Sequence, residues 1–234
     1  MKNKYIFILS ITFVSSLLLS LFSEGLKEKT LFNIQLDKKK NLLQTIGMNT
    51  DILTTDEILK EFNDNIKEIT LDLSGNVLSD VNHDQFVTKE NNATGELKYY
   101  IDENEYLPLF LSETMNAIII PISGKGLWSS LYGYFAIDKN NFSTVKGITF
   151  YKHGETPGLG AEITKEWFKS SFTGKEVYLD DSIESIKVTK AGQANENSLY
   201  EVNGISGATI TSRGVEDLLK RDLLRYENYF RKNK

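Results

Sequence analysis

The chain contains no cysteine among its 234 residues. It therefore cannot ligate an iron–sulfur cluster through thiolates, attach a c-type haem, form a disulfide or carry a lipoprotein anchor. Histidine is almost as scarce, because only His83 and His153 occur, and they lie too far apart in sequence to indicate a metal site. We expect no metal ligands, and any redox chemistry here requires an organic cofactor.

Basic residues are in the minority as well. Lysine and arginine total 27 against 32 acidic residues, which gives a formal net charge of −5. No basic stretch is interleaved with aromatic residues in the way that nucleic-acid binders show, so we expect no nucleic-acid partner. The hydrophobic share of 40% and the charged share of 25% are typical of a globular protein.

Charge is absent altogether from residues 6–22. At ~1.5 Å per residue this stretch forms a helix of roughly 25 Å, close to the minimum for spanning a bilayer. We expect an uncleaved single-pass anchor, and a cleaved signal peptide is the alternative. Basic residues at 27, 29 and 38–40 outnumber Lys2 and Lys4 before the stretch, which favours a cytoplasmic domain, but this rule is weak for long domains.

The rest of the chain mixes helical and strand periodicity. Apolar spacing predicts helices over 36–46, 161–172 and 215–230, and Thr211 or Ser212 is the expected N-cap of the last one. Thr54 with Glu57 forms a capping box before another helix. Strand candidates are 69–73, 117–122, 133–137, 145–151, 175–179 and 183–189. The polar stretch 85–105 resembles a surface insertion. These elements predict an α+β fold, in which one N-terminal transmembrane helix precedes a domain with a largely antiparallel sheet and flanking helices.

This pattern also suggests domain limits. We expect a membrane anchor over 1–24, a helical linker over 25–66 and an extracytoplasmic domain over 67–234, with its binding core at about 124–230.

Residues 203–212, Asn-Gly-Ile-Ser-Gly-Ala-Thr-Ile-Thr-Ser, lie between a short strand and the final helix. Thr209 lies just before the expected helix start, where free amide groups and the positive end of the helix dipole favour a phosphate. Arg213 is a candidate counter-charge. A plain glycine turn with a Ser/Thr cap is the alternative interpretation. The Walker A spacing is absent, which argues against nucleotide hydrolysis. Three hydroxyl groups in the run can add hydrogen bonds, those of Ser206, Thr211 and Ser212.

Two further runs are rich in glycine. Residues 153–160, His-Gly-Glu-Thr-Pro-Gly-Leu-Gly, form a tight turn that allows a flat ring to approach the backbone, although a simple strand-to-helix connection fits equally. Residues 124–133, Gly-Lys-Gly-Leu-Trp-Ser-Ser-Leu-Tyr-Gly, follow an apolar strand. Their aromatic side chains can pack on a cofactor or, by default, fill the core.

Together these runs resemble the C subunit (NqrC) of the sodium-translocating NADH:quinone reductase. The segments G-K-G-L-W-S at 124–129, E-T-P-G-L-G at 155–160 and S-G-A-T-x-T-S at 206–212 occur in that family's order and spacing, after a single N-terminal span. The resemblance covers nearly the whole chain. It implies an electron-transfer subunit that relays electrons from NADH towards quinone in a complex that exports Na⁺. It also implies a single-pass protein of the bacterial inner membrane with its main domain in the periplasm.

The resemblance further implies FMN joined through a phosphoester to Thr209, installed from FAD by a magnesium-dependent flavin transferase. The implied cofactor-binding residues are Thr209, Ser206, Gly207, Ala208, Thr211 and Ser212 at the attachment run, and Glu155, Thr156, Gly158, Leu159, Gly160 and Trp128 near the flavin ring. No catalytic residue is implied, and no G-x-G-x-x-G fingerprint marks a separate NADH site. Asn203 replaces the acidic residue that usually precedes the modified threonine by six positions.

Two alternatives stay open at this point. The related FMN-bearing G subunit of the Rnf-type ferredoxin:NAD oxidoreductase would share S-G-A-T and the anchor, although G-K-G-L-W-S favours NqrC. A non-redox, membrane-anchored binding module would use the glycine loops for a partner instead. For NqrC, the implied partners are the other subunits of the complex, the flavin transferase and the membrane.

Overall fold

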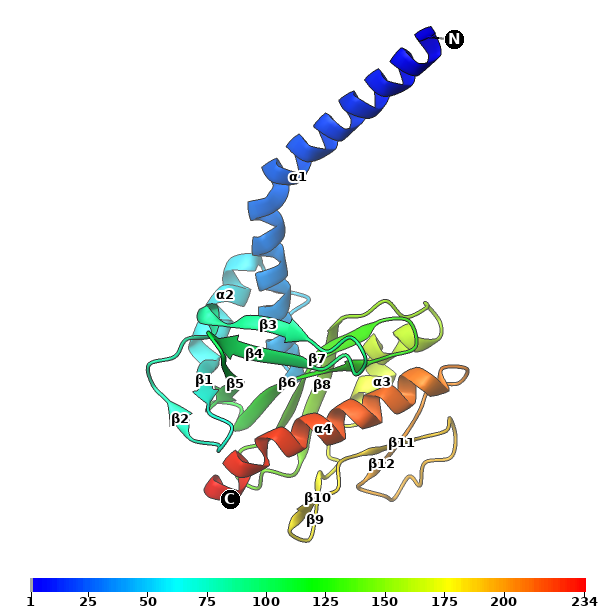
Figure 1. Cartoon of the computed structure of the whole chain (residues 1–234). Coiled ribbons are helices and arrows are strands. Elements are labelled where there is room, and N and C mark those ends of the chain that lie inside the picture. The colour runs from blue at the N-terminus through cyan, green and yellow to red at the C-terminus, as the bar shows by residue number, and fades with distance from the viewer. Residues whose placement is uncertain (1) are drawn as a thin grey trace. The chain divides into compact units, whose positions relative to one another are not determined.

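A computed structural model describes residues 2–234 (Figure 1). The described chain forms two compact units, one ending at Lys38 and the other spanning Lys39–Lys234. Helix α1, Lys2–Thr45, runs through this boundary. Within residues 2–234, its stretch Asn3–Thr45 is the one helix long and apolar enough to cross a membrane. Its large apolar side chains over 5–22 are exposed, as a lipid-facing helix requires.

The second unit contains the end of α1 and the remaining elements. Its other helices are α2 (Thr55–Asn65), α3 (Glu166–Ser170) and α4 (Thr209–Asn233), with short 3₁₀ turns η1 (His83–Gln85) and η2 (Gly160–Thr164). Its longer strands are β1 (Lys67–Leu71), β3 (Val87–Glu90), β4 (Leu97–Ile101), β5 (Asn104–Ser112), β6 (Ala117–Lys125), β7 (Ser130–Asp138) and β8 (Val145–Lys152). Its shorter strands are β2 (Val77–Leu78), β9 (Tyr178–Leu179), β10 (Ser182–Ile183), β11 (Lys187–Thr189) and β12 (Glu201–Asn203).

The main sheet is antiparallel throughout. Its strands follow the order β2-β1-β5-β6-β7-β8, and the β3–β4 hairpin attaches to the first part of β5. Two small sheets lie outside it, the antiparallel pair β9–β10 and the parallel pair β11–β12. A largely antiparallel sheet with flanking helices confirms the predicted fold class.

Both faces of this sheet are buried. Along β6, Ile118, Ile120 and Ile122 belong to the core cluster that also contains the apolar side of α4. Ile119 is buried but lies outside that cluster, because successive strand residues point to opposite faces. The end of α1 covers this second face, where Thr45 and Thr149 share a hydrogen bond of 2.6 Å between their hydroxyl groups. Helix α4 crosses the first face (Figure 1).

Helix α4 approaches β6 unusually closely at positions four residues apart. A Cβ on Gly214 would lie 2.1 Å from the backbone oxygen of Lys125, and a Cβ on Gly124 would lie 2.5 Å from Leu218. One turn further along, the Asp222 carboxylate accepts a hydrogen bond from the Ser123 backbone at 2.8 Å. Asp222 breaks the apolar spacing of this helix in the sequence, and this buried contact explains it.

Burial raises the pKa of Asp222 to about 6, against the attraction of Arg221. The folded chain therefore binds this proton more tightly than the unfolded chain, whose ordinary value is 3.8. The resulting stabilisation is complete below pH 3.8 and is lost as the pH rises to about 6. Two pKa units correspond to about 3 kcal/mol.

We expect Asp222→Asn to remove this decline. The measurement is the free energy of unfolding of the full chain in detergent between pH 4 and 7, over which the parent should lose about 2–3 kcal/mol relative to the variant. Equal slopes in both proteins would assign the pH dependence to other groups.

Several elements differ from the sequence-based expectation. Residues 85–105 form the β3–β4 hairpin and the start of β5, so they extend the sheet instead of forming a polar insertion. The expected helix over 161–172 is split into η2 and the short α3, and the strands at 175–179 and 183–189 shrink to β9, β10 and β11. The capping box at Thr54 and Glu57 is confirmed at the start of α2.

Candidate functional site

The three glycine-containing runs meet at the N-terminal end of α4. Residues 124–129 form the end of β6 and its turn into β7, 155–160 follow β8 and lead into η2, and 206–212 join β12 to α4. They are separated by tens of residues in sequence, and antiparallel pairing of β6, β7 and β8 brings the first two together.

The carboxylate of Glu155 joins these runs. Its Oε1 accepts hydrogen bonds from the backbone amides of Trp128 at 2.9 Å and Ser129 at 3.2 Å. Its Oε2 accepts from the Leu127 amide at 3.2 Å and from the Thr211 hydroxyl at 2.5 Å. One side chain of the second run therefore holds the first run and the third.

This carboxylate is 5% exposed and ionised. Burial by itself raises the pKa of a carboxyl group, but hydrogen bonds from Thr211 and from the amides of residues 127–129 hold the pKa of Glu155 below its ordinary value. Two glycines make room for it, because a Cβ on Gly126 or on Gly160 would lie 2.6 Å from one of its oxygens. Glu155 is thus an enclosed anion rather than an exposed wall of a pocket.

Helix α4 begins at Thr209, earlier than the sequence suggested. The expected N-cap, Thr211 or Ser212, is wrong: the N-cap residue is Ala208, which has no side chain able to accept from the first turn. Thr211 instead donates to Glu155, and the Ser212 hydroxyl accepts from the Ile205 amide at 2.9 Å. The amides of the first turn of α4 are therefore left for an external acceptor.

Thr209 itself is exposed at this helix end. Among residues 2–234, its hydroxyl group has no hydrogen-bond partner. Gly207 precedes it with φ +76°, a conformation that favours glycine, and Leu159 packs against Gly207 so closely that a Cβ there would lie 3.0 Å away. An accessible hydroxyl beside unpaired amides is suited to an esterified phosphate.

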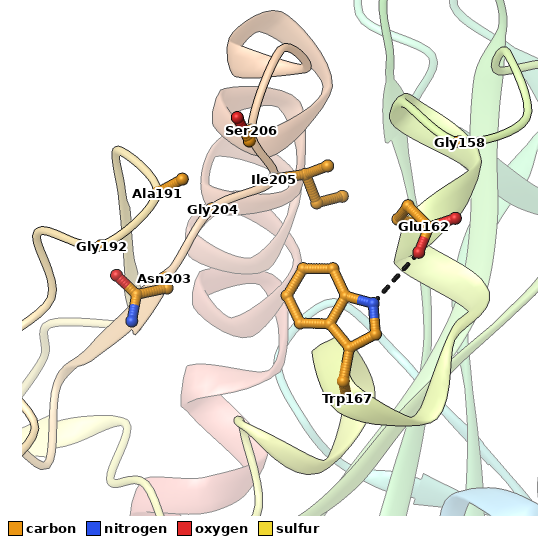
Figure 2. Close-up of a pocket in the computed structure, with 9 residues that line it drawn as sticks. All are labelled: Gly158, Glu162, Trp167, Ala191, Gly192, Asn203, Gly204, Ile205 and Ser206. Atoms are coloured by element: carbon orange, nitrogen blue, oxygen red, sulfur yellow. Dashed lines mark hydrogen bonds between the residues drawn. The ribbon is translucent and has the colours of Figure 1, made fainter.

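An open pocket of about 580 Å³ adjoins the start of α4 (Figure 2). Its lining residues are Gly158, Glu162, Trp167, Ala191, Gly192, Asn203, Gly204, Ile205 and Ser206. The Trp167 indole donates to Glu162 at 3.1 Å, and in Figure 2 its ring lies below Ile205 with the nitrogen toward Glu162. The Asn203 side-chain oxygen accepts a hydrogen bond from the Ala194 amide at 2.9 Å. This bond fixes the 191–194 loop, which forms one wall of the pocket through Ala191 and Gly192.

The predicted site residues divide into three groups. Gly158 and Ser206 line the pocket. Buried beneath the helix start are Glu155, Gly160, Ala208, Thr211 and Ser212. Exposed around it are Trp128, Thr156, Leu159, Gly207 and Thr209. Trp128 is 70% exposed, so it does not fill the core as its residue type alone would suggest.

Sequence reasoning missed most of the pocket wall. Trp167 and Glu162 were placed in an ordinary helix, and no motif marks the loop at Ala191 and Gly192. The spacing of Glu162 and Trp167, five residues apart, is the one local signal in the sequence that could have pointed there.

These residues fit FMN. The pocket volume lies within the usual range of cofactor sites, and the exposed indole of Trp167 offers an apolar surface for a flat ring. The unpaired amides and the positive dipole end at Thr209 suit the phosphate. In the described residues, no group of three or more acidic or histidine side chains could hold a metal ion.

Comparisons with known proteins agree with this geometry. Residues 126–223 match the family model of the FMN-binding domain. The chain is 30% identical over 222 residues to the C subunit of the Na⁺-translocating NADH-quinone reductase of Vibrio alginolyticus, covering 89% of this chain and 85% of that one. It is 33% identical over 217 residues to the same subunit of Yersinia pestis, covering 82% and 77%.

Solved structures give the same result. The crystal structure of the C subunit from Parabacteroides distasonis superposes with a TM-score of 0.72 at 30% identity, covering 88% of this chain and 96% of that one. The crystal structure of Shewanella oneidensis NqrC gives 0.67 at 25% identity, covering 83% and 94%.

An FMN-binding domain that follows an apolar N-terminal helix defines a membrane-anchored flavoprotein. More narrowly, the chain belongs to the NqrC family, the C subunits of the Na⁺-translocating NADH-quinone reductase.

Proposed function

We propose that this protein is the electron-transfer subunit of a Na⁺-translocating NADH:quinone reductase and that it carries FMN as a phosphoester on Thr209. The observation that supports the attachment point most strongly is the start of α4. There, an exposed hydroxyl without a partner in residues 2–234 stands in a first turn whose N-cap, Ala208, supplies no acceptor.

Different groups of the chain would hold the phosphate and the ring of the cofactor. The first-turn amides of α4 and the Ser206 hydroxyl would bind the phosphate, and Trp167 would support the ring from the pocket. Trp128 and Leu159 add exposed apolar surface on the two neighbouring runs. Bound FMN supplies electron transfer that can proceed in one- or two-electron steps, while the protein fixes its position. A cofactor that cannot diffuse away suits a relay between other redox centres.

Attachment requires a group transfer from FAD by a flavin transferase. The Thr209 oxygen forms a bond to the phosphorus on the riboflavin side, and the pyrophosphate bond to AMP breaks. AMP leaves with the electron pair, and the hydroxyl proton passes to a base of the transferase. No oxidant or reductant is consumed in this step.

The membrane arrangement is part of the same proposal. Residues 1–24 would form the anchor in the bacterial inner membrane, 25–66 would connect it to the domain, and 67–234 would lie in the periplasm, where the transferase acts. The other subunits of the complex would donate and accept the electrons and bind NADH and quinone. The relatives described above are named as C subunits of the Na⁺-translocating enzyme, which favours this complex over the Rnf type.

Mass spectrometry of the tryptic fragment containing Thr209, taken from native membranes, tests the attachment. We expect the fragment to weigh its amino acids plus one FMN minus one water. An unmodified fragment together with a colourless purified protein would refute the proposal and support a non-redox binding module. NADH oxidation by the membranes without a Na⁺ dependence would instead point to the Rnf complex.

A further inference from the structure

The Glu155 carboxylate is enclosed, yet it touches both other runs of the site. It accepts four hydrogen bonds, three from the amides of residues 127–129 and one from the Thr211 hydroxyl. Among the described residues it forms no salt bridge. Its negative charge is therefore balanced by oriented donors alone, and those donors belong to the segments that surround Thr209.

Each of the three connected segments also carries an exposed side chain. Residues 127–129 carry Trp128, the segment after Glu155 carries Leu159, and the first turn of α4 carries Thr209. Thr211 lies two residues after Thr209 in the same helical turn. Fixing the side chain of Thr211 therefore fixes where the Thr209 hydroxyl lies relative to Trp128 and Leu159.

A carboxylate is the side-chain group that can accept all four of these hydrogen bonds. Each oxygen accepts two hydrogen bonds, and the donors on both are fixed, apart from the Thr211 hydroxyl, which can rotate. A glutamine side chain has one accepting oxygen and one donating nitrogen. Whichever way it points, at least one of the three backbone amides of residues 127–129 faces a donor, so the loop or the helix start must move.

We propose that Glu155 is a positioning residue: acting through Thr211 and without contacting the flavin, it fixes the position of the Thr209 hydroxyl, the flavin acceptor, relative to the 127–129 loop. This proposal rests on the proposed attachment of FMN to Thr209. It replaces direct contact between Glu155 and the flavin ring by an indirect role, because the carboxylate is already surrounded by its own donors.

The test uses four variants of the full chain in detergent: Glu155→Gln, Thr211→Val, Thr211→Ser and Asp222→Asn. Valine keeps the shape of threonine and removes the hydroxyl, whereas serine keeps the hydroxyl. Asp222 is the matched control, since it is also a buried carboxylate that bonds a backbone amide of the β6 region and lies on α4, but far from Thr209 along the helix. The reaction is flavinylation of apo-protein by the flavin transferase with FAD and Mg²⁺.

We expect Glu155→Gln and Thr211→Val to slow flavinylation by roughly tenfold to a hundredfold, the penalty of an ångström-scale misplacement. Thr211→Ser should restore most of the rate. Asp222→Asn should change the melting temperature and leave the rate within about twofold, because it is distant from the reacting hydroxyl. Wild-type rates in both Glu155→Gln and Thr211→Val, or equal losses in Asp222→Asn, would overturn the positioning role.

Amide hydrogen exchange separates this proposal from the flavin assignment. Glu155→Gln should accelerate exchange in the apo-protein at the amides of 127–129, which bond Glu155, and at the Ser212 amide, which bonds the Ala208 carbonyl, whether or not Thr209 accepts FMN. If the wild-type chain takes no covalent flavin while these amides still respond, the attachment proposal fails and the coupling by Glu155 stands. Unchanged exchange at both segments would refute the coupling.

Discussion

Replacing Thr209 by alanine should reduce covalent flavin from about one per chain to none, the largest effect that any single substitution in this protein should have. The alanine side chain has no oxygen that can bond to phosphorus, and the neighbouring hydroxyls of Thr211 and Ser212 are buried and engaged with Glu155 and Ile205. In-gel fluorescence under denaturing conditions measures the loss, because only covalently held flavin survives.

This loss should occur without unfolding. Thr209 is exposed and lies at the first helical position, where alanine is a favourable residue, so the free energy of unfolding should change by less than about 0.5 kcal/mol. Thr209→Ser keeps the hydroxyl and should retain flavin, and Thr88→Ala removes an exposed threonine of β3 as a control. Persistent fluorescence in Thr209→Ala would place the ester elsewhere.

The strands of the central sheet were predictable because their sequence carries a local signal. Ile118 to Ile122 and the short apolar runs in β7 and β8 are typical of strands buried in a domain core. The β3–β4 hairpin was hidden, since its residues are polar and partly exposed and its pairing with β5 depends on the rest of the sheet. From composition alone, residues 85–105 therefore resembled a surface insertion.

At the site, the run 206–212 was visible in the sequence but its geometry was not. Thr211 and Ser212 are good N-cap residues, and local propensity placed the helix start there. Tertiary contacts override this propensity. The Thr211 hydroxyl donates a hydrogen bond to Glu155, and the Ser212 hydroxyl accepts one from the Ile205 amide. The helix consequently begins one turn earlier, with Thr209 exposed. No local pattern could reveal a hydrogen bond between residues 56 positions apart.

Replacing Gly214 by alanine should destabilise the domain, although the same change in an ordinary helix interior stabilises by about 1 kcal/mol. The new Cβ would lie 2.1 Å from the backbone oxygen of Lys125, and backbone cannot rotate away as a side chain can. Overpacking of this kind typically costs about 1–3 kcal/mol and more where backbone must shift. Thermal unfolding of the full chain in detergent measures the effect.

Gly25→Ala is the matched control. Gly25 lies inside α1, and a Cβ added there would have nothing within 4 Å, so this change should leave the unfolding of the domain unchanged.

Gly214→Ala should also affect attachment of the flavin. Gly214 follows Thr211 by three residues and therefore lies on the same side of α4. Moving the helix away from Lys125 lengthens the 2.5 Å bond from Thr211 to Glu155, and flavinylation should fall along with stability. A higher melting temperature with normal flavinylation would mean that α4 does not need this close approach to hold Thr209 in place.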